Sequence, residues 1–320
     1  MTSAHLPPEA VAPIRPDDVI LAVDVGGTDT KSALLDSTTT LQDIQRRPTA
    51  VRAEGSGDAV VETVVGILAD YRAAWPGKKI RAVGLIAPGL VDERNGVGLF
   101  SSNLGWRNYP FADRVSGVTG LPVTFGHDVG AAADAEVRMG AAQGHADVVV
   151  MIIGTGIAGA VFCGGRRVLG GGYAGELGHA QVPGGERCPC GAQGCLETVG
   201  SARAIARRYT ERSGRAVEGA REVLQLKEAG DAHAAGVVAE AVDALAFNIC
   251  QLSAVLGTEA VVIGGGLAQA GEQLFGPLAA EVGKRLSFHR RPLLLAARMG
   301  QDAGLIGAGL RARDLLGAGI

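Results

Sequence analysis

Residues 19–36, VILAVDVGGTDTKSALLD, contain two apolar, β-branched runs on either side of a Gly-Gly pair. Runs of this kind, bounded by turn residues, are typical of β-strands. The stretch therefore predicts a hairpin whose turn contains Gly26 and Gly27. Residues 148–163, VVVMIIGTGIAGAVFC, repeat this design around a GTG turn. The repeat predicts two similar lobes, each built around a hairpin with a glycine turn.

Length and periodicity support two α/β lobes. A chain of 320 residues exceeds the usual size of one hydrophobic core, so a cleft between two lobes is expected. Strand-like runs (80–87, 121–125, 259–263, 293–297) alternate with helical periodicity (59–75, 128–142, 200–213, 219–228, 232–256). The segment through Asn103 and Trp106 is expected to be a loop. We expect a loose, disordered tail at 1–18, a small lobe at 19–126 that the C-terminal helix 303–320 joins, and a large lobe at 127–302.

The bulk composition excludes several classes of function. The charges nearly balance, with 30 basic against 33 acidic residues, and only 4% of residues are aromatic, so neither the basic field nor the stacking surface of a nucleic-acid binder is present. The first residues contain prolines and acids where a signal peptide has a basic flank and an apolar run. The apolar run at 148–163 is short for a membrane span and is broken by glycines. We expect a cytoplasmic protein with no nucleic-acid or membrane partner.

Residues 175–197, GELGHAQVPGGERCPCGAQGCLE, place one imidazole and three thiols in a glycine-rich segment. His179, Cys188, Cys190 and Cys195 supply the four donors of a tetrahedral structural zinc, with no position open for a reactive water. The alternative is a disulfide-bearing loop, although a C-x-C pair is poorly spaced for self-bridging and nothing indicates secretion. The other two cysteines, Cys163 and Cys250, lie in apolar runs and are expected to be small buried hydrophobes.

Three glycine-rich turns are candidates for phosphate or nucleotide binding. Backbone N–H groups in such turns make concavities for anions. GTGIAG at 154–159 fits a dinucleotide pattern, but that motif opens a helix, whereas the residues that follow are strand-like. The first and the third could instead be ordinary turns, with Asp24 as a turn cap in the first. The candidate residues are Asp24, Gly26, Gly27, Thr28 and Lys31 in the first turn, Gly154, Thr155 and Gly156 in the second, and Gly264, Gly265 and Gly266 after strand 259–263.

Phosphoryl transfer to a hydroxyl needs a positioned base. Asp128 precedes the helical run VGAAADAEVRMGAA, where it could be that base or an N-cap of the helix.

The string GH followed by CxCGxxGCxE, at 178–197, resembles the zinc motif of the ROK family of sugar kinases and sugar-responsive repressors. The resemblance implies an actin-like, ribonuclease H-like ATPase fold and a homodimer. It implies that Asp24 and the two hairpin turns hold MgATP, with the 264–266 loop near the adenosine. It also implies that Asp128 is the general base. It also implies sugar contacts from Asn103, His127, Asp128, Glu176, His179 and Glu197, with His179 binding both zinc and sugar.

The chain departs from the family where the pattern Asn-Asp-x-Asn reads His127-Asp128-Val129-Gly130. An imidazole in place of an amide rearranges the available donors, so we expect a weakened affinity for glucose that His127→Asn improves.

The resemblance favours ATP-dependent phosphorylation of glucose, with an N-acyl hexosamine, mannose or fructose as alternative substrates and polyphosphate as a rival donor. A repressor is the alternative from another class, but only about 18 residues precede the first strand, too few for a DNA-binding module. A catalytically silent sugar-binding protein is the third, against which Asp128 and both hairpins argue.

Overall fold

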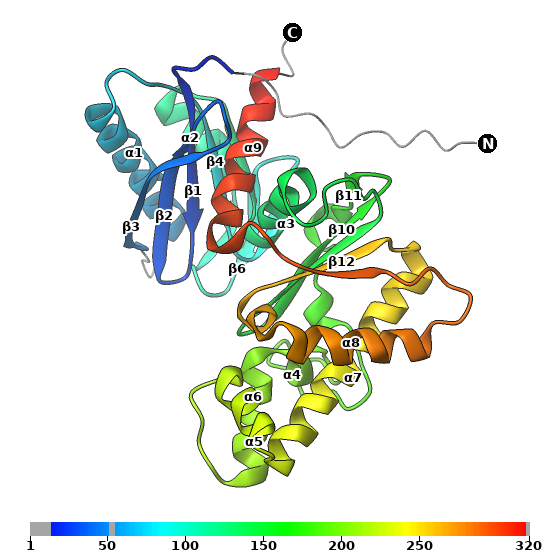
Figure 1. The fold of residues 1–320 in the computed structure, drawn as a ribbon. Helices are drawn as coiled ribbons and strands as arrows, with labels where there is room; N and C mark the ends of the chain where they lie inside the picture. Colours follow the sequence, from blue (N-terminus) through cyan, green and yellow to red (C-terminus); the bar gives the residue numbers. More distant parts are fainter. Residues whose placement is uncertain (1–13, 51–54, 318–320) are drawn as a thin grey trace, which may run out of the picture. The chain divides into compact units, whose positions relative to one another are not determined.

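The computed structural model describes residues 14–50 and 55–317 (Figure 1). Most of the expected tail at 1–18 lies outside these residues. The chain forms two compact units. Of the described residues, the first unit contains those up to Arg138, Leu169–Ala174, and 299–317. The second unit consists of Met139–Val168 and Gly175–Arg298.

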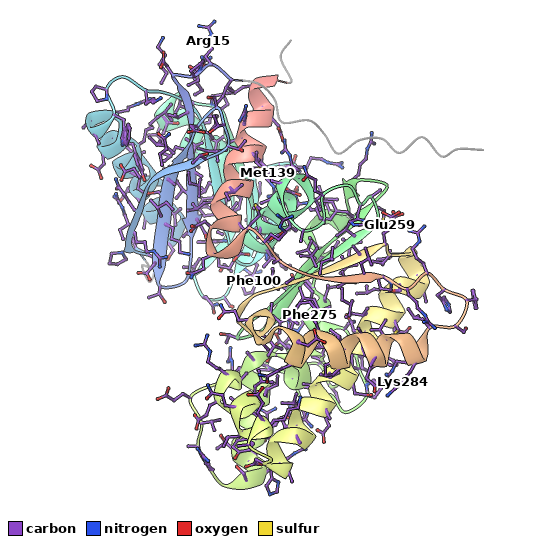
Figure 2. The ribbon with its side chains drawn as sticks, viewed as in Figure 1. Arg15, Phe100, Met139, Glu259, Phe275 and Lys284 are labelled. Carbon is purple, nitrogen blue, oxygen red and sulfur yellow. The ribbon has the colours of Figure 1, made fainter. Side chains whose placement is uncertain are left out.

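The units divide at the end of α3 (Asp128–Met139), later than the boundary at residue 127 that the sequence suggested. Met139, labelled in Figure 2, is the last residue of this helix. Helix α3 stays with the first unit because it packs on α9 (Ala303–Gly317): both terminal nitrogens of Arg138 donate to Asp314, at 2.8 and 2.9 Å. Gly307 of α9 lies so close to α3 that a Cβ there would be 1.8 Å from the Ala131 carbonyl oxygen.

The first unit is built on a sheet with the order β3-β2-β1-β4-β8. Its strands are β1 (Asp18–Val25), β2 (Asp29–Leu35), β3 (Leu41–Pro48), β4 (Lys79–Ala87) and β8 (Val123–His127). Strands β1 to β3 are antiparallel, whereas β4 is parallel to both β1 and β8. The predicted hairpin at 19–36 is the pair β1 and β2.

Successive residues of β1 face opposite sides of this sheet. Val19, Leu21 and Val23 pack in one cluster with apolar residues of α1 (Ser56–Ala74) and α2 (Phe111–Thr119). Ala22 packs on the other side with residues of α3 and α9. Asp24, two residues further along β1, therefore lies on the side that α3 and α9 cover.

The segment around Asn103 is not the loop that the sequence suggested. It contains a three-stranded antiparallel sheet of β5 (Leu90–Asp92), β6 (Val97–Ser101) and β7 (Trp106–Tyr109), followed by α2. These strands are short and mostly half-exposed, so they lack a long apolar run. Trp106, buried against Phe111, anchors the small sheet to the core.

The second unit repeats the strand order of the first, as β11-β10-β9-β12-β13. Its strands are β9 (Val148–Ile153), β10 (Ile157–Cys163), β11 (Arg166–Arg167), β12 (Ala260–Gly264) and β13 (Leu293–Ala296). Again three antiparallel strands are followed by two parallel ones. The duplicated topology is that of the actin-like ATPase fold, which confirms the expected fold class. The GTG segment joins antiparallel strands, which rules out the dinucleotide motif.

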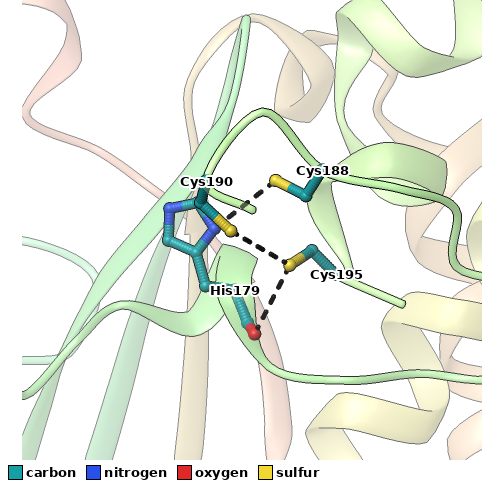
Figure 3. Close-up of side chains that lie close together, drawn as sticks. All are labelled: His179, Cys188, Cys190 and Cys195. Atoms are coloured by element: carbon teal, nitrogen blue, oxygen red, sulfur yellow. Dashed lines mark hydrogen bonds between the residues drawn. The ribbon is translucent and has the colours of Figure 1, made fainter. Parts of the chain in front are cut away.

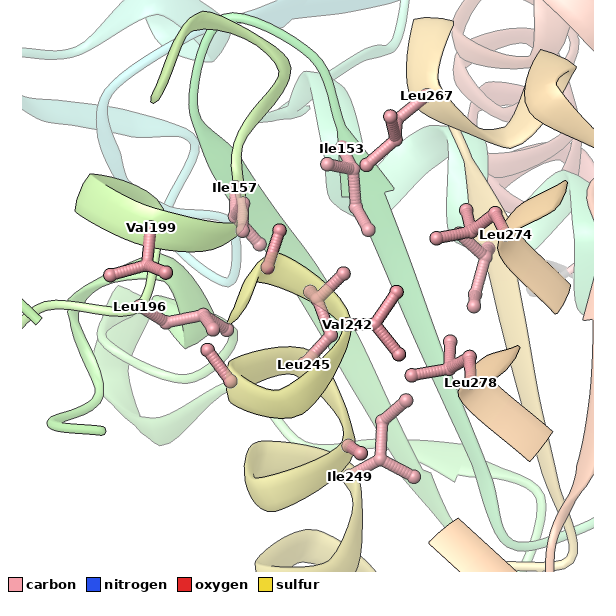
Figure 4. Close-up of a cluster of buried hydrophobic side chains, with 14 of the residues drawn as sticks. Ile153, Ile157, Leu196, Val199, Val242, Leu245, Ile249, Leu267, Leu274 and Leu278 are labelled. Carbon is pink, nitrogen blue, oxygen red and sulfur yellow. The ribbon is translucent and has the colours of Figure 1, made fainter. Parts of the chain in front are cut away.

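Helices complete the second unit; two of them share a core with β9 and β12, and the others pack on the longer of these two helices. They are α4 (Glu197–Gly200), α5 (Ala202–Ser213), α6 (Ala220–Glu228), α7 (Ala232–Leu256) and α8 (Glu272–Arg285). Figure 4 shows Val242, Leu245 and Ile249 of α7 packing with Leu274 and Leu278 of α8 next to Ile153. Helix α7 is long and apolar enough for a membrane span, but its buried residues belong to this core.

Candidate active site and metal centre

The first candidate phosphate turn connects β1 and β2. Gly26 donates from its N–H to the Asp29 carbonyl at 2.9 Å, and a Cβ on Gly26 would lie 2.8 Å from that oxygen. The Thr49 hydroxyl donates to the Gly26 carbonyl at 2.8 Å, which ties the turn to the residues after β3. Gly27 and Thr28 are exposed, and a Cβ on Gly27 would meet nothing within 4 Å. The turn thus presents its outer backbone, at 27–28, to solvent.

Asp24 lies at the end of β1, paired in register with Lys31 of β2. Desolvation by burial, together with the nearby Asp128 carboxylate, raises the pKa of Asp24 to about 6, although Lys31 opposes this shift. Gly304 of α9 lies next to this carboxylate, because a Cβ on Gly304 would be 3.5 Å from Oδ2 of Asp24. Two neighbouring carboxylates favour a cation between or beside them. The structure therefore brings Asp24, Lys31 and Asp128 to one region of the first unit.

Asp128 is the first residue of α3, and its Oδ1 accepts the N–H of Val129 at 2.6 Å. The adjacent His127 ends β8. Its Nε2 lies 3.4 Å from Oδ1 of Asp128, and its Nδ1 accepts the N–H of Gly130 at 3.4 Å. The Asp128 side chain is 33% exposed, enough for a ligand to reach it. The strand β8 and the helix α3 thus fix a carboxylate at the surface of this unit.

A buried ion cluster lies behind His127. Oε1 of Glu93 accepts the His127 backbone N–H at 2.9 Å and pairs with Nη1 of Arg311 at 3.2 Å. Nε of Arg311 donates to Asp134 of α3. The three charged side chains are only 12 to 15% exposed. Sequence reasoning missed this cluster because its members come from β5–β6, α3 and α9, and no local pattern connects them.

Asn103 lies in the exposed turn between β6 and β7. Its Oδ1 accepts from the Ser102 hydroxyl at 3.5 Å, and buried Leu104 and Trp106 hold the turn in place. The structure gives Asn103 no contact with the other candidate residues, so its sugar role stays a prediction.

The second phosphate turn, Gly154-Thr155-Gly156, connects β9 and β10. Gly154 donates to the Gly156 carbonyl at 2.9 Å, and Thr155 is exposed. A Cβ on Gly156 would lie 2.8 Å from Oε2 of Glu197, the first residue of α4. The structure therefore brings Glu197, a candidate sugar ligand, against the predicted phosphate turn.

The third glycine turn follows β12. A Cβ on Gly264 would lie 2.6 Å from Cδ1 of Ile152, and Gly265 has φ +81° with the Ile153 carbonyl 2.4 Å from its missing Cβ. The backbone contact and the positive φ require glycine at 265, whereas the Ile152 methyl group beside Gly264 could shift. Gly266, in contrast, is exposed with open space beside it. Only Gly266 has room on its side-chain side for a ligand.

The four expected metal ligands come together in the second unit (Figure 3). Their ligand atoms, from His179, Cys188, Cys190 and Cys195, all lie within 4.8 Å of one another. Sγ of Cys190 is 3.7 Å from Sγ of Cys195, and Nδ1 of His179 is 3.8 Å from Sγ of Cys188. Tetrahedral zinc with sulfur at about 2.3 Å separates two thiolates by about 3.8 Å, so the cluster fits this metal.

The chemistry of the thiols also fits a cation. Burial raises the pKa of the Cys188 thiol to about 12 and raises that of Cys195. A metal ion offsets this cost by binding the thiolates. All five cysteines are free thiols, so the structure contains no disulfide loop. Cys250 is buried as expected, but Cys163, the last residue of β10, is only partly buried.

Glu176 precedes the short helix η2 (Leu177–His179), His179 is its last residue, and the helix packs closely on β10. A Cβ on Gly178 would lie 2.1 Å from the Ile157 carbonyl oxygen. Nε2 of His179 is 4.0 Å from Oε2 of Glu176, while Nδ1 faces the thiol cluster and lies 3.9 Å from Oε1 of Glu197. The imidazole thus has Glu176 on its Nε2 side, and the thiol cluster together with Glu197 on its Nδ1 side.

Comparison with known proteins agrees with this geometry. The ROK family model matches residues 20–314. A glucokinase of Halalkalibacterium halodurans is 33% identical over 314 residues, covering 90% of this chain and 93% of the relative. An N-acetylmannosamine kinase of Salmonella paratyphi A is 32% identical over 298 residues, covering 92% and 98%.

Solved structures show the same fold. A ROK hexokinase from Thermus thermophilus superimposes with a TM-score of 0.82 at 34% identity, covering 94% of this chain and all of the other. A ROK glucokinase from Streptomyces griseus, in complex with glucose and AMPPNP, gives 0.75 at 30% identity, covering 92% and 99%. Fold and relatives together define the class of actin-like sugar kinases. Within that class, the chain belongs to the ROK family.

Proposed function

We propose that the protein transfers the γ-phosphoryl group of ATP to a hydroxyl of a hexose, with glucose as the favoured substrate and glucose 6-phosphate as the product. The observation that carries this proposal is the Asp128 carboxylate. It is held at the start of α3 by the Val129 N–H, partly exposed, and close enough to Asp24 to raise the pKa of that second acid. A held, accessible carboxylate suits the base that accepts a hydroxyl proton.

The glycine turns suit the nucleotide. The exposed backbone at Gly27–Thr28 and at Thr155 offers N–H donors for phosphate oxygens, with Lys31 as a cation beside the first turn. Asp24 would hold the Mg²⁺ that accompanies ATP, since Mg²⁺ prefers carboxylate oxygens and neutralises phosphate charge. Gly266 would lie against the nucleoside, with Gly264 and Gly265 shaping the turn.

The sugar would bind through Asn103, Asp128, Glu176, His179 and Glu197. Carboxylates accept hydrogen bonds from pairs of sugar hydroxyls, and a buried hydroxyl left unpaired costs about 1 to 3 kcal/mol. A structural zinc on His179, Cys188, Cys190 and Cys195 would fix His179 through Nδ1 and leave Nε2, next to Glu176, to the sugar. We propose zinc for this site because its donor set and spacing fit that metal.

A second candidate is an N-acyl hexosamine kinase, which the similarity to the N-acetylmannosamine kinase favours. Mannose and fructose are further candidate substrates. We propose that the enzyme acts in the cytoplasm as a homodimer.

A coupled assay of ADP release tests the proposal. Wild-type protein with MgATP is assayed on glucose, mannose, fructose, glucosamine, N-acetylglucosamine and N-acetylmannosamine, and polyphosphate is tested as a rival donor. We expect the highest kcat/KM with glucose. Preference for N-acetylmannosamine would favour the second candidate, and no turnover with any sugar would contradict the kinase proposal.

A further inference from the structure

We propose that His127 is a positioning residue for the base: it holds Oδ1 of Asp128, so that Oδ2 is the oxygen that accepts the sugar proton. This inference rests on the proposed function, and it replaces the expectation that His127 mainly binds sugar hydroxyls.

The contacts of the His127 ring determine which nitrogen carries the proton. Nδ1 accepts the N–H of Gly130, so Nδ1 presents its lone pair and the neutral ring has its proton on Nε2. Nε2 lies 3.4 Å from Oδ1 of Asp128. The proton-bearing nitrogen therefore faces the carboxylate. The N–H that fixes this tautomer belongs to the backbone of residue 130, which is the second residue after Asp128.

The two contacts on Asp128 select one oxygen. Oδ1 accepts the Val129 N–H at 2.6 Å and also faces Nε2 of His127. Within residues 14–50 and 55–317, no hydrogen bond or ion pair reaches Oδ2. A carboxylate can rotate about its Cβ–Cγ bond, and the Val129 hydrogen bond, together with the adjacent imidazole, restricts that rotation. Oδ2 is then presented to the substrate in a fixed direction, which is the geometry that a general base needs.

The backbone of His127 is itself fixed. Glu93 accepts its N–H at 2.9 Å while pairing with Arg311 of α9. Gly126 makes room for this arginine, since a Cβ there would lie 2.1 Å from its Nη1. Arg311 also donates to Asp134, which lies further along α3 than Asp128. The Glu93–Arg311 pair thus holds the backbone from which the imidazole extends toward Asp128.

Amide substitutions separate the two ring nitrogens. The amide of glutamine reaches about as far as Nε2, whereas that of asparagine reaches about as far as Nδ1. We therefore expect His127→Gln to keep kcat within about threefold of wild type, and His127→Asn to lower kcat about tenfold, equivalent to about 1.4 kcal/mol. The dissociation constant for the sugar, measured by calorimetry without ATP, should change less than twofold in both variants. His233→Asn, an exposed histidine of α7, is the matched control.

A double variant tests the coupling to Asp128. If His127 acts through the base, adding His127→Asn to Asp128→Asn should lower kcat no further, since residues that act as a unit are not additive. Thermal unfolding of every variant checks the fold. If His127→Asn does not fold, the kcat of His127→Gln is the test: a kcat within about threefold of wild type supports the inference, and a tenfold loss contradicts it.

Several outcomes would overturn the inference. The inference is wrong if His127→Gln loses kcat tenfold, or if the losses in the double variant are additive. It is also wrong if His127→Asn keeps its kcat but changes the sugar dissociation constant. That last result would restore the role of His127 as a sugar ligand. If the wild type is active and His127→Asn is equally active, the role of His127 is contradicted but the proposed kinase function is not. Wild-type protein without turnover on any sugar contradicts the proposed function as well.

Discussion

Sγ of Cys188 lies 3.3 Å from Oε1 of Glu197. A thiol of the metal cluster therefore contacts a carboxylate that also lies against the Gly154–Gly156 turn. Loss of the metal should disturb Glu197 directly, because this contact and the His179 ring both position its side chain.

We predict about one zinc ion per chain by metal analysis, resistant to mild chelation. Cys190→Ser should lose the metal, lower the melting temperature by several degrees, and raise the KM for sugar about tenfold, since metal binding is coupled to local folding and to ligand orientation. Cys190 is exposed, so the substitution itself disturbs no packing.

Cys163→Ser is the matched control, because Cys163 lies outside the cluster and is partly exposed. It should retain zinc and activity. If zinc-free protein kept its full stability and its full affinity for sugar, the four residues would not form a structural zinc site.

The two glycines of the first turn should behave differently. Gly26→Ala places a methyl group 2.8 Å from a backbone oxygen, whereas Gly27→Ala meets nothing within 4 Å. We expect Gly26→Ala to lower the free energy of unfolding by about 1 to 3 kcal/mol. Gly27→Ala should keep the melting temperature but raise the KM for ATP several-fold, because its methyl group covers backbone that would approach a phosphate. An unchanged KM in the folded Gly27→Ala variant would argue that this turn holds no phosphate.

The pH dependence of activity should report Asp24, whose pKa is raised to about 6 by burial and by Asp128. Below this pH, Asp24 is protonated and binds Mg²⁺ poorly, so kcat/KM should fall as the pH drops through about 6. Because Mg²⁺ favours the ionised carboxylate, a higher Mg²⁺ concentration should move this limb to lower pH. A limb that does not respond to Mg²⁺ would argue against Asp24 as a metal ligand.

The same pKa predicts the sign of a stability change. The folded protein binds a proton at Asp24 up to pH about 6, whereas the unfolded chain releases it near 3.8. Stability from this group is therefore present at low pH and declines as the pH rises from about 4 to 6. In buffer without Mg²⁺, Asp24→Asn should stabilise the fold at pH 7.5 by about 1 to 3 kcal/mol and have little effect at pH 4, as measured by urea unfolding. Equal effects at both pH values would contradict the raised pKa.

Much of the fold could be predicted from the sequence because the two central hairpins are apolar, β-branched and marked by glycine turns. The edge strand β3 was missed because LQDIQRRP is largely polar, as expected of a strand at the edge of its sheet. The boundary after α3 was missed because the tight contact between Gly307 and Ala131 joins residues far apart in the chain.

The metal ligands could be predicted from their spacing, since all four lie within one short segment. The orientation of Asp128 could not, because it depends on the tautomer of His127 and on Glu93 and Arg311, which only the folded backbone brings together.

The turnover of Asp128→Asn distinguishes a general base from a helix cap at this position. The variant keeps a side chain of the same shape that can still accept the Val129 N–H, so the fold and the binding of glucose should persist, as checked by thermal unfolding and calorimetry. The coupled ADP-release assay with saturating glucose and MgATP should then show kcat reduced about 10²- to 10⁴-fold, the usual contribution of a positioned base. A folded, glucose-binding Asp128→Asn variant with near-normal kcat would contradict the account and reduce Asp128 to a cap of α3.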